Sequence, residues 1–295
     1  MASGEFDRYI EHKCEPWRHG HFEFLLFSTC PDMVGRAVEG GVDGIVVDWE
    51  FRGKPERQRG ADTQINNDTL DDLVRIRALT PSPIIVRING FHAATALEIQ
   101  QAIDAGANEI LLPMVDSTDQ VKATIDMVNG RAGVGILVET VQALAIAPEL
   151  GRLPLRRVYL GLNDLAIQRK SCNIFEPLID GVLESVSENI ECAFGFGGLT
   201  RPDRGHPIPC RLLMAEMARL HTSFCFLRRS FLADVAGISI AKELAGMRQA
   251  ILESHKRTDT QISIDRGRLI QAVQSAMSAA RGNAQLEPLC RVSEE

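Results

Sequence analysis

The amino-acid sequence predicts an α/β protein of the (β/α)8 or TIM-barrel class with an additional C-terminal helix. A short apolar run, a turn and an amphipathic stretch alternate along the chain, which is typical of a parallel sheet covered by helices. Eight such apolar runs occur, and eight is the strand number of a closed barrel. The 295 residues suit one barrel as a single domain. A doubly wound sheet of eight strands is the alternative.

The eight apolar runs are the strand candidates. In chain order they are HFEFLLFS from His21, DGIVVDWE from Asp43, PIIVRING from Pro83, EILLPMV from Glu109, GVGILVET from Gly133, RVYLGLND from Arg157, ECAFGFGG from Glu191 and TSFCFLRR from Thr222.

Amphipathic stretches between the strands are the helix candidates. They cover residues 31–39, 69–79, 94–105, 118–128, 141–150, 174–189, 211–220 and 232–254. Four of them end at a glycine, which is a common helix terminator, namely Gly40, Gly106, Gly130 and Gly151.

Three segments follow from this pattern. Residues 1–20 are expected to form a cap under the barrel, residues 21–257 the catalytic barrel, and residues 258–295 a helix over 264–280 with a polar tail.

Composition excludes several classes of protein. The net charge of −7 and the pI of about 5.6 argue against nucleic acid as a partner, because phosphate binding needs a dense basic surface. The seven cysteines are scattered without CxxC spacing, which is typical of reduced thiols in a cytoplasmic protein. No signal peptide is recognisable at the N-terminus, and no apolar run reaches the length of a membrane span.

The carboxyl ends of the strands point to an active site, because barrel enzymes build their sites there. Acids, arginines and glycines end these strands, and so many charged side chains at one rim are hard to explain by packing alone. The residues concerned are Asp48, Glu50, Arg87, Asn89, Pro113, Glu139, Gly161, Asn163, Asp164, Gly197, Gly198, Arg228 and Arg229.

Glu139 and Asp164 end adjacent predicted strands. Two neighbouring carboxylates repel each other unless a proton or a cation lies between them. Hard oxygen ligands favour Mg2+ or Mn2+, so the pair is a candidate metal site. The alternative is that one carboxyl is protonated and hydrogen-bonds the other.

Arg87 ends an apolar strand, where two roles are compatible. It pairs with Asp48 or Glu50 across the barrel mouth, and its planar fork binds a substrate carboxylate or carbonyl oxygen and stabilises an enolate. Arg228 is preferred to Arg229 as an inward-facing residue, because it shares its strand face with Phe226.

Glycines near the same rim allow a ligand to approach the backbone closely. They are Gly161, which follows the sixth predicted strand, and Gly197 and Gly198, which end the seventh. A tight turn is the alternative explanation for the FGFGG segment.

Five motifs resemble those of the HpcH/HpaI aldolase and citrate lyase β-subunit superfamily, a branch of the phosphoenolpyruvate/pyruvate barrels. They are DGIVVDWE, VRING, GANEILLPMV, GILVET and YLGLNDLA, in family order over residues 24–166.

The resemblance implies roles for particular residues. Glu139 and Asp164 correspond to the family's ligands of Mg2+ or Mn2+, and Arg87 to the arginine that binds the oxo acid or its enolate. Asp48 and Glu50 then hold the waters of the metal or the arginine. The substrate-binding residues expected around them are Asn89, Pro113, Gly161, Asn163, Gly197, Gly198 and Arg228.

The sequence also departs from the family pattern. Phe51 stands where pyruvate aldolases carry the histidine that serves as base. A metal-bound water, Lys54, His92 and His206 are the remaining candidates for this role. The Asn of VRING resembles the citrate-lyase-like branch, and the second half of the chain matches neither subgroup closely, which indicates a divergent member.

Three functional hypotheses follow. The first is a metal-dependent lyase or aldolase acting on a small 2-oxo acid through a pyruvate or oxaloacetate enolate, in the direction of cleavage or of synthesis. The second is Claisen chemistry on a CoA thioester such as acetyl-CoA, with Arg52, Lys54, Arg57 and Arg59 as candidate contacts. The third is a non-catalytic barrel that binds a ligand. By analogy with relatives, a homo-oligomer is expected.

Overall fold

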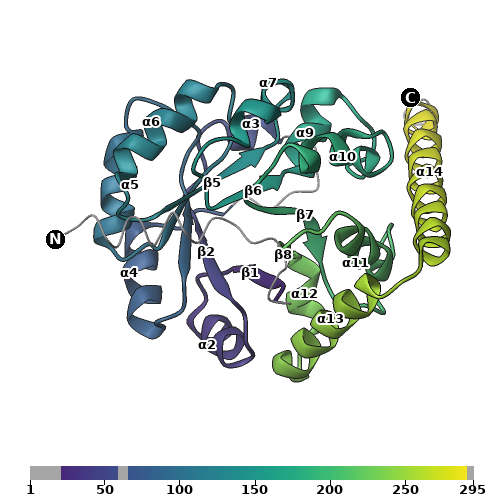
Figure 1. The fold of residues 1–295 in the computed structure, drawn as a ribbon, viewed down its shortest axis with the longest axis horizontal. Helices are drawn as coiled ribbons and strands as arrows, with labels where there is room; N and C mark the ends of the chain where they lie inside the picture. Colours follow the sequence, from purple (N-terminus) through teal and green to yellow (C-terminus); the bar gives the residue numbers. More distant parts are fainter. Residues whose placement is uncertain (1–20, 59–65, 291–295) are drawn as a thin grey trace.

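The computed structural model describes residues 21–58 and 66–290, with side chains described up to residue 280. The predicted N-terminal cap, residues 1–20, and Arg59 lie outside the described residues. Eight parallel strands form a closed barrel in simple sequence order, and β8 pairs with β1 (Figure 1). This confirms the predicted fold class and excludes the doubly wound sheet.

Each strand lies within its predicted apolar run, except that β7 continues one residue beyond its run to Leu199. The strands are β1 (Glu23–Phe27), β2 (Gly44–Asp48), β3 (Ile84–Arg87), β4 (Glu109–Leu112), β5 (Gly133–Val138), β6 (Arg157–Leu160), β7 (Ala193–Leu199) and β8 (Phe224–Leu227).

Helices surround the barrel (Figure 1). They are α2 (Pro31–Glu39), α3 (Lys54–Arg57), α4 (Leu70–Leu79), α5 (Thr95–Asp104), α6 (Thr118–Val128), α7 (Val141–Ala145), α8 (Ala147–Leu150), α9 (Leu162–Arg169), the 3-10 turn η1 (Glu176–Leu178), α10 (Val182–Glu188), α11 (Cys210–Arg219), α12 (Arg229–Asp234), α13 (Ile240–His255) and α14 (Asp259–Cys290).

Three predicted helices are each divided in two. The 141–150 stretch breaks at Ile146, just before the proline that opens α8. The 174–189 stretch becomes η1 and α10, separated at Gly181, and the 232–254 stretch becomes α12 and α13, separated near Gly237. Both glycines have positive φ, a conformation that ends a helix.

Two short helices were not predicted, and both lie at the barrel mouth. They are α3, which follows Gly53 with its φ of 68°, and α9, which begins directly after β6. Each is too short for its hydrophobic periodicity to be recognised in the sequence.

The strands alternate between two apolar layers, as the two-residue period of a strand requires. Outward-facing side chains pack under the helices in the larger cluster. Inward-facing side chains fill the barrel, and they are Leu25, Val46, Ile85, Leu111, Leu137, Tyr159, Phe224 and Phe226. The barrel interior is therefore a packed core that closes the floor of the mouth.

An ion-pair cluster closes the opposite, N-terminal end of the barrel. Buried Arg157 contacts Glu109 at 2.7 Å and Glu23 at 2.9 Å, and its guanidinium lies over the ring of Phe224. Because these groups neutralise one another below the apolar layer, they have a structural role.

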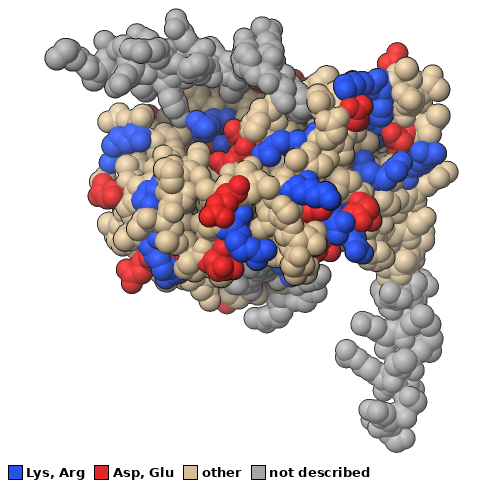
Figure 2. Space-filling view, turned by 90° about the horizontal axis from the view of Figure 1, so that it is seen from below, with Lys and Arg blue, Asp and Glu red and all other residues tan. Residues whose placement is uncertain are grey.

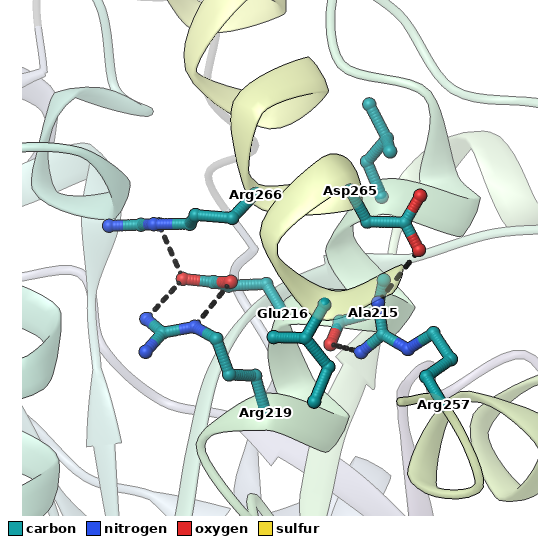
Figure 3. A pocket seen from close by; sticks show the side chains of 8 residues that line it. Ala215, Glu216, Arg219, Arg257, Asp265 and Arg266 are labelled. Atoms are coloured by element: carbon teal, nitrogen blue, oxygen red, sulfur yellow. Dashed lines mark hydrogen bonds and ion pairs between the residues drawn. The ribbon is translucent and has the colours of Figure 1, made fainter. Parts of the chain in front are cut away.

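The C-terminal helix α14 rises at the side of the barrel and contacts α11 (Figure 1). It begins at Asp259 rather than at 264, and it continues to Cys290 where the sequence predicted a polar tail. Figure 3 shows its docking site, where Glu216 of α11 accepts from Arg219 and from Arg266 of α14. Arg257 adds an ion pair with Asp265 at 2.8 Å and a hydrogen bond to the carbonyl of Ala215 at 2.6 Å.

Acidic and basic side chains are interspersed on the face shown in Figure 2, without a field of one sign. None of the helices in the described part of the chain is long and apolar enough to cross a membrane.

Candidate active site

A cavity of about 870 Å³ opens at the carboxyl ends of the strands. Its floor is formed by the inner apolar layer, including Leu137, Tyr159 and Phe226. Charged side chains stand above this floor because the inward-facing rows of several strands continue with a charged residue at their ends. Thus Asp48 follows Val46, Arg87 follows Ile85, and Glu139 follows Leu137.

The structure gathers most of the predicted site residues around this cavity. Those that line it are Arg87, Glu139, Gly161, Asn163, Asp164, Gly197, Gly198 and Arg228. Asp48 and Glu50 are buried directly behind Arg87. Asn89 and Pro113 do not line the cavity.

Arg87 is fixed by a bidentate contact with Asp48. Its Nε and Nη2 donate to the two carboxylate oxygens, both at 2.7 Å, and its Nη1 lies 3.5 Å from Glu50. Burial alone would raise the pKa of Asp48, but Arg87 and Lys54 outweigh it and lower this pKa below its ordinary value. Both predicted roles of Arg87 are therefore compatible with its position, since the paired guanidinium also faces the cavity.

The loop after β2 carries basic side chains that turn inward to the acids. The ammonium of Lys54 is buried, 3.2 Å from Asp48 and 3.2 Å from Glu50. Arg57 lies between Glu50 and Asp164, at 2.6 Å from each. Gln58 donates to the second oxygen of Asp164 at 2.9 Å. Lys54 and Arg57 are therefore held in ion pairs with acids of the site.

Glu139 lies deeper, with Oε1 accepting from the backbone N–H of Met114 at 3.0 Å. Burial, followed by the nearby charges of Glu50 and Asp164, raises the pKa of Glu139 to about 8. Gly161 is required beside it, because a Cβ at this position would stand 2.4 Å from Oε2 of Glu139. The predicted glycine therefore makes room for a carboxyl group of the protein itself.

The predicted metal site does not match this arrangement of donors. Both oxygens of Asp164 already accept from Arg57 and Gln58. Within residues 21–58 and 66–290, no three His, Cys, Asp or Glu side chains gather as a metal site would need. The side chains as they stand therefore do not fit Mg2+ or Mn2+ at Glu139 and Asp164, because a cation and an amide of the chain itself already donate to Asp164.

Arg228 stands at the β8 end of the cavity. Its Nε donates to the carbonyl of Gly198 at 2.7 Å, and its guanidinium lies over the ring of Phe175. Gly198 leaves room for it, since a Cβ there would be 2.6 Å from Cγ of Arg228. Its Nη2 is buried and has no hydrogen-bond partner among the described residues.

Asn89 holds the loop after β2 in place. Its Oδ1 accepts from the backbone N–H groups of Phe51 and Arg52, and its Nδ2 donates to Glu98. All of these partners belong to the protein, so Asn89 has the structural role of holding this loop.

The candidate bases are placed differently from one another. Lys54 is paired with two carboxylates, and His92 bonds Thr95 and lies 3.4 Å from Glu98, away from the cavity lining. His206 is the candidate imidazole that lines the cavity.

Sequence reasoning missed Gln58, Asn66 and Tyr159. Asn66 donates to Asp48 at 3.1 Å, and the hydroxyl of Tyr159 donates to the carbonyl of Gly197 at 2.6 Å. The signal that could have revealed Gln58 is its place next to Arg57, in the loop that follows the acids Asp48 and Glu50.

Residues 23–168 match the sequence profile of the family described as HpcH/HpaI aldolase/citrate lyase. The chain belongs to this family. Family members are lyase- or aldolase-like enzymes, and the matched residues include every acid of the site together with Arg87. No curated protein sequence matches the chain significantly.

Solved structures of the same fold include members of this family. The chain is similar to the HpcH/HpaI aldolase from Desulfitobacterium hafniense DCB-2, with 16% identity and a TM-score of 0.53, over 78% of this chain and 94% of that one. It is also similar to the citrate synthase SbnG, with 17% identity and a TM-score of 0.53, over 78% of this chain and 94% of that one. With tryptophan synthase from M. tuberculosis the identity is 13% and the TM-score 0.52, over 84% of this chain and 96% of that one. At these identities the likeness shows the fold alone.

Proposed function

We propose that this chain is a carbon–carbon lyase of the aldolase type that acts on a small 2-oxo acid through its enolate, in the direction of cleavage or of synthesis. The observation that carries this proposal is Arg87, which Asp48 holds by a bidentate contact at the mouth of the cavity. A guanidinium fixed in advance stabilises an oxyanion without having to reorganise during the reaction.

In the proposed cleavage of a 4-hydroxy-2-oxo acid, a base takes the proton of the 4-hydroxyl and the C3–C4 bond breaks. The bonding electron pair moves toward the C2 oxygen, where Arg87 stabilises the enolate, and an aldehyde or ketone leaves. The base, which now carries that proton, then donates it to C3 to complete the 2-oxo acid. We assign the base to His206, the candidate imidazole of the cavity lining.

Arg228 supports a substrate with a second acidic group. Its buried Nη2 has no hydrogen-bond partner among the described residues, and a buried donor of this kind is costly unless a ligand satisfies it. A carboxylate at the far end of the substrate matches the charge and the planar fork of Arg228.

The hypothesis of CoA chemistry receives less support from the same loop. Lys54 and Arg57, two of its four candidate contacts, turn inward to Glu50, and Arg59 lies outside the described residues.

We also propose a reducing, cytoplasmic location, because Cys30, Cys172, Cys210 and Cys225 are free thiols.

Exchange of the C3 hydrogens of pyruvate and oxaloacetate with deuterium, followed by NMR, tests the proposal without knowledge of the aldehyde partner. Enolate formation by the wild type is expected to accelerate exchange of at least one oxo acid. His206→Gln is expected to lower the rate by about 100-fold, because general-base catalysis contributes at least that much. If the wild type exchanges neither oxo acid above the rate in buffer, the lyase proposal is wrong.

A further inference from the structure

A short basic segment, Lys54–Gln58, lies at the barrel mouth and is called here the basic arm. It consists of α3 and the residue after it. Gly53 has a φ of 68°, so the chain turns back over the barrel mouth directly after β2. Asn89 accepts from two backbone N–H groups just before this turn. The arm therefore reaches the acids at the ends of β2 and β6.

Arg57 and Gln58 each donate to one oxygen of Asp164. Arg57 Nε donates to Oδ1 at 2.6 Å and Gln58 Nε2 donates to Oδ2 at 2.9 Å. Arg57 Nη2 also donates to Glu50 at 2.6 Å, so one guanidinium bridges an acid that follows β2 and an acid that follows β6, on opposite sides of the barrel. A cation between two carboxylates relieves their repulsion. The family resemblance places a metal ion between Glu139 and Asp164, whereas Arg57 lies between Glu50 and Asp164, so Asp164 is the acid that the two arrangements share.

Lys54 brings a second fixed charge into the cavity wall. Only 2% of its side chain is exposed, and its ammonium forms ion pairs with Asp48 and Glu50. An ammonium has three N–H donors, so two acids leave one donor for a ligand. Lys54 lines the cavity beside Arg87, whereas Arg57 lies behind it.

The charges of the site nearly balance without an added ion. Asp48, Glu50, Glu139 and Asp164 supply four carboxyl groups, and Lys54, Arg57 and Arg87 supply three cations. A divalent cation would have to displace Arg57 and Gln58 from Asp164 and leave the guanidinium without one of its partners. Removing one partner of a buried charge pair is strongly unfavourable.

We propose that the basic arm replaces the divalent metal in this protein: Lys54 donates with Arg87 to the enolate oxygen, while Arg57 and Gln58 position the acids. The role of Lys54 rests on the proposed lyase function, whereas the replacement of the metal does not. Lys54 is then a catalytic residue, and Arg57 and Gln58 are positioning residues.

Calorimetric titration of the chelator-treated full-length protein with Mn2+ tests the replacement directly. The wild type is expected to show no binding with a Kd below about 1 mM, whereas Arg57→Met is expected to bind at least about tenfold more tightly. Arg57→Met frees Asp164 and leaves the acids without their bridging cation, so a divalent ion takes its place. Arg52→Met is the matched control, because it removes the same charge from an exposed position in the same loop.

Wild-type binding as tight as that of Arg57→Met would overturn the inference, and so would unchanged weak binding by a folded Arg57→Met protein. If Arg57→Met does not fold, the wild-type titration decides alone: a Kd in the micromolar range contradicts the replacement, and no binding up to about 1 mM supports it.

The exchange of deuterium into oxo acids tests the catalytic part. The wild-type rate is expected to be the same in EDTA as in Mg2+, and Lys54→Met is expected to lower it by about 100-fold, as for loss of one oxyanion donor. Loss of exchange in EDTA with recovery in Mn2+ would overturn the inference and leave the lyase proposal standing. Absence of exchange under every condition would instead contradict the lyase proposal. The Mn2+ titration would still test whether the basic arm replaces the metal ion.

Discussion

Individual side chains at the barrel mouth are positioned by their neighbours rather than by their own strands alone. Arg87 takes its orientation from Asp48, the residue paired with it in the adjacent strand. Arg228 takes its orientation from the carbonyl of Gly198 on β7. The chemistry of each residue therefore depends on a partner that is distant in the sequence.

Arg87→Lys tests the fixed fork of this arginine. A lysine retains the positive charge but cannot keep two parallel contacts with Asp48 and also reach the substrate. We expect kcat/KM for exchange or cleavage to fall by about 100-fold or more, with little change in melting temperature. Steady-state kinetics and thermal unfolding measure the two effects, and a loss of only a few-fold would assign Arg87 a structural role.

Glu139→Gln tests the buried carboxyl group through the pH dependence of stability. The pKa of Glu139 is raised from 4.5 to about 8 in the folded protein, so the native state keeps a proton that the unfolded chain loses. This contribution to stability is complete below pH 4.5 and is lost as the pH rises toward 8.

The variant should therefore gain melting temperature relative to the wild type as the pH rises across this interval, measured in EDTA. Glu188→Gln, at an exposed position of α10, is the control and should show no such trend. A constant difference between Glu139→Gln and the wild type would mean that the carboxyl is ionised throughout.

At the scale of elements, short segments at the mouth decide how the site is assembled. The four-residue helix α3 brings two cations inward, and α9 begins at Gly161 so that Asp164 enters its first turn. Longer helices follow the sequence pattern, because their apolar stripe packs on the barrel regardless of the details of the mouth.

The docking of α14 on α11 depends on a cluster of ion pairs at Glu216 (Figure 3). This carboxylate is 3% exposed and contacts Arg219 at 2.7 Å and Arg266 at 2.5 Å. Glu184 also contacts both arginines, which moderates the loss when Glu216 is neutralised.

Glu216→Gln is expected to lower the free energy of unfolding by about 1–3 kcal/mol, because it leaves buried donors with weaker acceptors. Urea denaturation measures this change, again with Glu188→Gln as the exposed control. An unchanged midpoint would show that α14 docks mainly through its apolar contacts.

At the scale of the whole molecule, binding of a metal ion would change the stability of the folded protein. A ligand that binds only the native state raises the melting temperature, and at 1,000 times its Kd it adds about 4 kcal/mol. If the basic arm replaces the ion, the melting temperature of the wild type should be the same in Mg2+ as in EDTA. Thermal unfolding with matched ionic strength measures this, and a rise of several degrees in Mg2+ would contradict the replacement.

The sequence by itself determined the closed barrel, the positions of its eight strands and the end of the barrel at which the acids, Arg87 and Arg228 gather. Period-two alternation and strand length are local properties, so they can be recognised without the fold. The acids Asp48, Glu50, Glu139 and Asp164 could be matched to those of the family because they also lie in short local motifs.

Only the tertiary structure decided what those acids contact. Arg57 and Asp164 are 107 residues apart in the sequence, and no periodicity relates them. The turn at Gly53 and the brace at Asn89 place the basic arm over the mouth, and burial then makes its ion pairs strong. A charged loop of the sequence thus becomes part of the candidate site because the fold places it over the barrel mouth.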